Sequence, residues 1–182
     1  MAISEKLYTI TDYEAFAEAH PDAVLELING QIVNKLGTEL RGYLMVNIAS
    51  CIVEWKKRHD AKGHPTITTS HRLNNDKYNE RRPDVSFRYT DDDVSQKSAV
   101  YTMPDFAVEV KSLGNTYVGL REKAEFYIGH GTRLVWLVYP ARQIVEVYFA
   151  DGSSELFTME HTLSGGDVLP EFEMAVKEIF EG

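Results

Sequence analysis

Residues 104–112 read PDFAVEVKS, a short apolar run with a Glu and a Lys near its end. A β-strand alternates its side chains between two faces. This alternation predicts one fully apolar face and one that carries both charges, formed by Phe106, Val108 and Val110 and by Ala107, Glu109 and Lys111. An unpaired charge buried in a sheet costs several kcal/mol, so both charges need partners.

Length and composition limit what those partners can be. The chain has 182 residues and a formal net charge of −9, which predicts a single domain over residues 1–182. The sequence contains no long apolar run, and its N-terminus lacks the pattern of a signal peptide, so we expect a cytoplasmic protein outside the membrane. Cys51 is the only cysteine, which excludes an intrachain disulfide and predicts a small core residue.

The first half of the chain shows clear local signals. Residues 11–14, TDYE, have the form of a capping box and predict a helix that continues to about His20. Asn29-Gly30 predicts a hairpin between two short strands. A long helix is expected over residues 38–58, with a buried stripe of Leu40, Leu44, Ile48, Ile52 and Trp55.

The rest of the chain alternates between strand and helix patterns. A second amphipathic helix is expected over residues 117–129, and a short closing helix within 171–180. Strands are expected in residues 66–73, 84–89, 105–110, 133–140, 143–149 and 154–159. This order predicts an α/β fold, in which helices flank a central mixed sheet.

Several common catalytic motifs are absent from the sequence. There is no G-x-S-x-G elbow or P-loop, and the six histidines contain no i, i+4 pair for a helical zinc site. The remaining candidates are acidic. Asp84 follows Pro83 at the start of an expected strand, Glu109 lies in the next strand, and Glu26 lies in the hairpin.

Asp84 followed by Glu109-Val110-Lys111 resembles the PD-(D/E)XK signature of restriction-endonuclease-like nucleases. The likeness to a bacterial family of restriction-endonuclease-like proteins extends over nearly the whole chain, through LELINGQIV, RRPDVSF, PDFAVEVKS, REKAEFYIGHGTRLVWLVYP and LPEFEMAVKEIF. The resemblance implies a mixed sheet flanked by helices and a divalent metal held by carboxylates. It also implies DNA as the substrate.

The resemblance assigns roles to individual residues. Asp84 and Glu109, with Val110, would hold the metal, Glu26 would be a further ligand or position a water, and Lys111 would be the catalytic lysine. Family members commonly carry a His at the start of the long helix, where this chain has Glu39 and Arg41. Many also keep a lysine in the following helix.

Lys123 is the lysine of that following helix. It lies at helical spacing from Leu120 and Tyr127, on or beside the face expected to pack on the sheet. Its ammonium group therefore either reaches back to the carboxylates or extends past Tyr127 to solvent.

The residue types suggest a reaction. Two carboxylates about 4 Å apart repel by roughly 4 kcal/mol at an effective dielectric constant near 20, so they need a cation between them. An all-oxygen site favours Mg²⁺ or Mn²⁺, which polarises a phosphoryl oxygen and lowers the pKa of a bound water. We therefore expect a Mg²⁺-dependent endonuclease that hydrolyses phosphodiester bonds in DNA.

Other interpretations stay open at this point. The acidic balance favours a non-catalytic module that retains the fold and binds nucleic acid or protein. A structural interpretation has Asp84 capping a turn and Glu109 paired with Lys111 or Arg121. A two-carboxylate glycosidase is disfavoured, because no cluster of aromatic residues for a sugar cleft stands near Asp84 or Glu109. A homodimer also stays open.

The charge is distributed unevenly. Residues 56–82 carry a local charge of +5, whereas residues 141–182 carry −7. The basic segment predicts phosphate contacts from Arg72, Lys77, Arg81 and Arg82. Part of the excess positive charge in this segment has an alternative explanation, because Lys56 and Lys57 near the end of the long helix complement the helix dipole.

Overall fold

A six-stranded mixed sheet with strand order β3-β4-β5-β6-β7-β8 forms the centre of the computed structural model, which describes residues 6–35, 37–94 and 96–181. Strands β5 and β6 are parallel, joined by the helix α3 (Tyr117–Gly129), and the other neighbours are antiparallel. The strands are β3 (His64–Ile67), β4 (Val85–Arg88), β5 (Phe106–Val110), β6 (Leu134–Tyr139), β7 (Ile144–Phe149) and β8 (Ser154–Phe157). The predicted α/β fold is confirmed.

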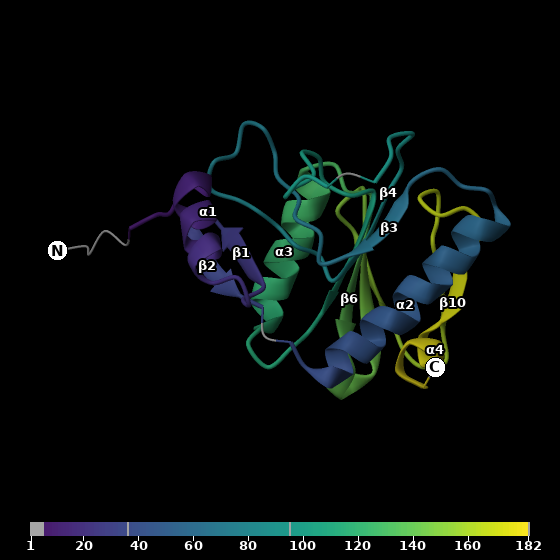
Figure 1. The fold of residues 1–182 in the computed structure, drawn as a ribbon. Helices are drawn as coiled ribbons and strands as arrows, with labels where there is room; N and C mark the ends of the chain where they lie inside the picture. The colour runs from purple at the N-terminus through teal and green to yellow at the C-terminus, as the bar shows by residue number, and fades with distance from the viewer. Residues whose placement is uncertain (1–5, 36, 95, 182) are drawn as a thin grey trace.

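The two faces of the sheet are covered by different helices (Figure 1). One face packs against α2 (Glu39–Arg58) and α4 (Val176–Glu181), in a core that includes Phe106, Val108 and Val110. The opposite face packs against α3 in a second core that includes Ala107 and Tyr127. The alternation predicted for β5 is therefore correct, and Glu109 lies on the α3 side.

The N-terminal part of the chain forms a small layer beside α3 (Figure 1). It consists of α1 (Ile10–Ala19) and an antiparallel hairpin of β1 (Leu25–Ile28) and β2 (Gln31–Asn34). Asn29 and Gly30 have φ angles of 49° and 78°, as the hairpin turn requires, so this prediction is confirmed. The capping box, however, is formed by Thr9 and Asp12 rather than by TDYE.

The long helix α2 begins after the N-cap Thr38, close to the predicted boundary. The buried stripe predicted for this helix is only partly correct. Leu40 is 53% exposed, whereas the other four residues are buried, namely Leu44, Ile48, Ile52 and Trp55. The first turn extends beyond the hydrophobic core, and Leu40 lines a surface cavity there. Arg41, not Leu40, is the buried side chain of this turn.

Three further expectations need correction or refinement. The strand expected over 66–73 is β3, which ends at Ile67, and the next residue, Thr68, has a φ of 50°. A further strand pair, β9 (Thr162–Ser164) and β10 (Glu173–Ala175), takes the start of the expected closing helix. Cys51, predicted to be a core residue, is half-buried against the core.

No helix in the described ranges has the length and apolar character to cross a membrane.

A buried cluster of carboxylates and cationic groups as the candidate active site

Three carboxylates from three strand segments meet beneath α3. Glu26 lies in β1, Asp84 immediately precedes β4 and Glu109 lies in β5, and each is at most 1% exposed. The Asp84 amide donates to the carbonyl of Val108 at 2.8 Å, which continues the antiparallel β4–β5 ladder and sets Asp84 beside Glu109. Asp84 and Glu109, which the resemblance assigns to one metal site, therefore lie side by side.

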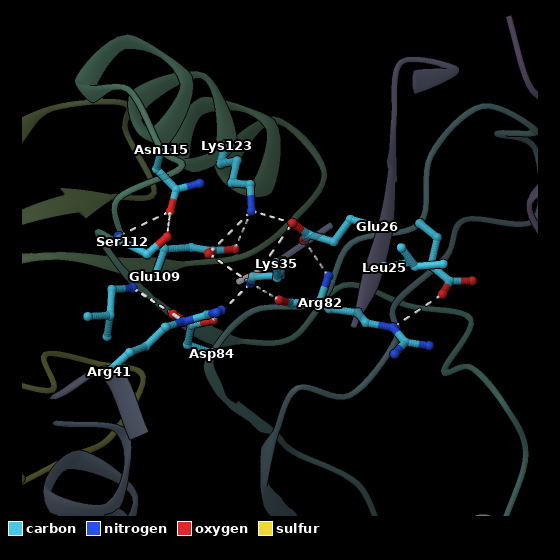
Figure 2. A network of polar contacts seen from close by, with 12 residues as sticks. Leu25, Glu26, Lys35, Arg41, Arg82, Asp84, Glu109, Ser112, Asn115 and Lys123 are labelled. Carbon is cyan, nitrogen blue, oxygen red and sulfur yellow. Dashed lines mark hydrogen bonds and ion pairs between the residues drawn. The ribbon is translucent and has the colours of Figure 1, made fainter. Parts of the chain in front are cut away.

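Lys35, directly after β2, places its ammonium group among all three carboxylates (Figure 2). Its Nζ lies 2.8 Å from Asp84 Oδ1, 3.1 Å from Glu109 Oε2 and 3.9 Å from Glu26 Oε2, and it also donates to the Arg82 carbonyl. Since one nitrogen contacts both Asp84 and Glu109, these carboxylates lie within about 6 Å of each other. The cation between them is therefore an ammonium group.

The sequence interpretation missed Lys35, although the hairpin carried a signal for it. Glu26 pairs with Val33 across the β1–β2 ladder. Lys35 stands two positions beyond Val33, and strand alternation returns it to the face shared with Glu26. A lysine at this diagonal position can reach a carboxylate on the neighbouring strand.

Asp84 is held by a second cation and by the backbone. Arg41, in the first turn of α2, donates from Nε to Asp84 Oδ2 at 2.9 Å and from Nη2 to Asp84 Oδ1. The Val110 amide donates to Oδ2 at 2.9 Å. Burial raises the pKa of the Asp84 carboxyl, but the charges of Lys35 and Arg41 outweigh it and lower the pKa to about 2. Asp84 is thus an anion at neutral pH.

Lys123 reaches the carboxylates rather than solvent. Its Nζ lies 2.5 Å from Glu26 Oε2 and 3.3 Å from both oxygens of Glu109. Tyr127, one turn further along α3, donates to Glu109 Oε1 at 3.0 Å. Burial raises the pKa of Glu26, but the ammonium groups of Lys35 and Lys123 outweigh it and lower the pKa overall.

Lys111 lies apart from this cluster. Its ammonium group contacts the Ser112 carbonyl at 3.4 Å and lies 5.0 Å from the centre of the Tyr117 ring. Within the described ranges it forms no ion pair with Glu109, whose neighbouring cations are Lys35 and Lys123. Arg121 is not a partner of Glu109 either, because it lies 3.1 Å from Glu146.

Lys111 faces a cavity instead. This cavity measures about 390 Å³ and is lined mostly by apolar residues, together with Thr38, Arg41, Lys111 and Ser112. Arg41 also contacts Asp84, so the cavity adjoins the carboxylate cluster. Lys111 therefore lies on the solvent side of the site.

Two of the four predicted phosphate-binding residues are in the interior. Arg72 is buried and pairs with Glu14 at 2.6 Å and with Glu80. Arg81 is buried against the Phe126 ring, 4.0 Å from its centre, and donates to Asn79 at 2.9 Å. These guanidinium groups are buried and already have protein partners, so in this structure they are not accessible for the predicted phosphate contacts.

Lys77 and Arg82, the other two residues predicted to contact phosphates, differ in exposure. Lys77 is exposed, and its ammonium group lies over the Tyr78 ring. Arg82 has a side chain that is 27% exposed, 3.4 Å from Glu80. Lys77 and Arg82 thus keep part of their charge accessible from solvent.

The donor chemistry of the cluster fits a hard divalent cation, since it offers carboxylate oxygens from Glu26, Asp84 and Glu109. As the side chains stand, however, the described residues include no group of three or more His, Cys, Asp or Glu arranged to hold a metal ion. The space among the carboxylates contains the Lys35 ammonium group, and the charges of Lys35, Arg41 and Lys123 balance the three carboxylates.

Comparison with known proteins agrees with this architecture. Residues 10–177 match the model of the Uma2 family, described as "Putative restriction endonuclease". Among solved structures, "a putative nuclease belonging to DUF820 from Anabaena variabilis" superposes with a TM-score of 0.79 at 18% identity, over 94% of this chain and 97% of that chain. At this identity the likeness shows a shared fold. No curated protein matches the chain.

Proposed function

The chain belongs to the Uma2 family, and from this membership we propose that it is a metal-dependent endonuclease that hydrolyses phosphodiester bonds in DNA. The observation that supports this proposal best is the convergence of Glu26, Asp84 and Glu109 on one buried point with Lys123 beside them. Carboxylate oxygens gathered from separate strands are the donor type that a hard divalent ion prefers.

Each residue of the cluster has a part in the proposal. Asp84 and Glu109, together with Val110, would hold Mg²⁺ or Mn²⁺ at the position where both carboxylates now contact Lys35, and Glu26 would be a further ligand or position a water. When bound, such an ion polarises a phosphoryl oxygen and acidifies a bound water. Lys123, 3.3 Å from Glu109, is placed to offset negative charge that develops in the transition state.

The surroundings of the cluster indicate where DNA would lie. Arg41 and Lys111 line the cavity of about 390 Å³ beside Asp84, so a phosphate on that side would meet two cationic groups. We therefore assign Lys111 to substrate contact and Lys123 to the role of catalytic lysine. The proposal includes a homodimer in the bacterial cytoplasm, in which each of the two sites would cut one strand of a duplex.

Plasmid cleavage with Mg²⁺, with Mn²⁺ and with EDTA tests this function. We expect nicking that requires the divalent ion and is abolished in Glu109→Gln, which loses a ligand charge. Glu146→Gln is the matched control, because Glu146 is also a buried strand glutamate but contacts Arg121 and Tyr139 instead of the cluster. Equal cleavage by Glu109→Gln and the wild type would assign the activity to a contaminant.

One observation favours a second function, a non-catalytic module that binds nucleic acid. The three carboxylates are already neutralised by Lys35, Arg41 and Lys123, so the fold needs no metal to tolerate them. For such a module, fluorescence anisotropy would report DNA binding while no divalent ion supports cleavage.

A further inference from the structure

The position of Lys35 adds a feature that neither the family nor the proposed function assigns. We infer that Lys35 is an internal cation that occupies the metal position of the cluster, and that a divalent ion binds only when the Lys35 ammonium group leaves. This inference rests on the proposed function, because both concern the same carboxylates. It concerns binding alone and no chemical step.

The contacts of Lys35 are those of a central cation. Its ammonium group lies within hydrogen-bond distance of Asp84 and Glu109, donates to the Arg82 carbonyl and is 3.9 Å from Glu26. These neighbours are the oxygen donors that the proposed function gives to the metal, apart from the added Arg82 carbonyl. A small divalent ion and this ammonium group cannot share the same oxygens at close range, because like charges repel strongly where burial reduces screening.

The other two cations of the cluster are placed differently. Arg41 approaches Asp84 from α2 and Lys123 approaches Glu26 and Glu109 from α3. Of the three, Lys35 is the one with carboxylate contacts to all three acidic residues. Displacement of Lys35 alone would therefore remove one cationic contact from each carboxylate. Arg41 and Lys123 would keep their pairs with the same three oxygens, Asp84 Oδ1, Glu26 Oε2 and Glu109 Oε2.

The structure provides a place for the displaced side chain. Lys35 also lines a cavity of about 640 Å³ together with Asn34, Gly37 and residues 19–24. The backbone of Lys35 is fixed, because its amide donates to the Val24 carbonyl at 2.7 Å. The inference therefore requires rotation about the side-chain bonds of Lys35 into this cavity, with the hairpin left closed.

Direct titration of Mn²⁺ into the protein without nucleic acid tests the inference. Lys35→Met keeps the length of the side chain and removes its charge, so it should bind Mn²⁺ at least tenfold more tightly than the wild type. The control Lys111→Met removes a neighbouring charge that has no pair with the carboxylates, and should change the affinity less than threefold. Free Mn²⁺ is measured by electron paramagnetic resonance.

The results separate this inference from the proposed function. Equal or weaker Mn²⁺ binding by Lys35→Met, beside a wild type that binds Mn²⁺, would overturn the role of Lys35 and leave the nuclease proposal intact. If neither protein binds Mn²⁺, both the inference and the metal-dependent function fail.

A measurement on the wild type covers the case in which Lys35→Met does not fold. Lysine acetylation by acetic anhydride, quantified by mass spectrometry, reports the accessibility of each ammonium group. Lys35 is buried and should be protected without metal, and saturating Mg²⁺ should raise its labelling several-fold. Lys62, whose side chain is 74% exposed, is the internal standard and should not change. Labelling of Lys35 that ignores saturating Mg²⁺ would contradict the displacement.

Discussion

Lys123 Nζ lies 2.5 Å from Glu26 Oε2, which joins α3 to the hairpin strand β1 across 97 positions of the chain. The same ammonium group lies 3.3 Å from each oxygen of Glu109 in the central sheet. Lys123 therefore links the N-terminal layer to the sheet at the point where the acidic residues meet. This relationship changes which lysine is expected to matter most.

The first prediction compares the two lysines. Lys123→Met should reduce Mg²⁺-dependent plasmid cleavage by about 10² or more, the usual effect of losing one electrostatic stabiliser next to the reacting groups. Lys111→Met should reduce it by less than about tenfold, because Lys111 has no contact with the carboxylates. Initial cleavage rates at saturating DNA show which variant loses more activity, and circular dichroism checks that both variants fold. A larger loss for Lys111→Met would return the catalytic role to Lys111.

The second prediction concerns stability without metal. Asp84→Asn should lower the free energy of unfolding by about 3 kcal/mol, because Lys35 and Arg41 stay buried with one anion fewer. If no cation stood between Asp84 and Glu109, their repulsion would make the same change neutral or stabilising. Urea denaturation in EDTA shows whether Asp84→Asn lowers or raises the free energy of unfolding. Asp91→Asn, in an exposed pair with Lys62, is the control and should change stability by less than about 0.5 kcal/mol.

The third prediction concerns acid. The pKa of Asp84 in the folded protein is about 2, below the ordinary value of 3.8, so the ionised carboxylate stabilises the fold above pH 3.8. This contribution, about 2 kcal/mol, is lost as the pH falls through the folded pKa. The stability difference between the wild type and Asp84→Asn should therefore narrow between about pH 5 and pH 2. Urea denaturation at several pH values measures this stability difference. A difference that stays constant over this pH range would contradict the lowered pKa of Asp84.

The fourth prediction separates buried from accessible arginine and lysine residues. Lys77→Ala with Arg82→Ala should flatten the salt dependence of DNA binding by up to about 0.9 for each phosphate that these side chains neutralise in the wild type. Arg72→Ala should mainly reduce stability, because it leaves Glu80 buried without this guanidinium group. Fluorescence anisotropy at several salt concentrations measures the slope, and thermal unfolding measures the stability. An unchanged slope in the double variant would remove the basic segment from the proposed DNA surface.

Local patterns predicted much of the fold. The helix α3 spans the predicted residues 117–129, and the hairpin turns at Asn29-Gly30, because helical periodicity and turn conformation depend on neighbouring residues. Leu40 was placed wrongly by the same kind of argument. Its spacing from Leu44 is correct for a buried stripe, but periodicity does not show where the core ends.

The sequence by itself determined the two faces of β5 and the acidic character of the candidate site, because strand alternation and residue type are local properties. Only the tertiary structure decided which cations neutralise Asp84 and Glu109. Lys35, Arg41 and Lys123 come from a hairpin and two different helices, and none is next to these carboxylates in the sequence. A buried carboxylate takes the cation that folding brings within hydrogen-bond distance, so Lys111, two residues from Glu109, remains outside the cluster.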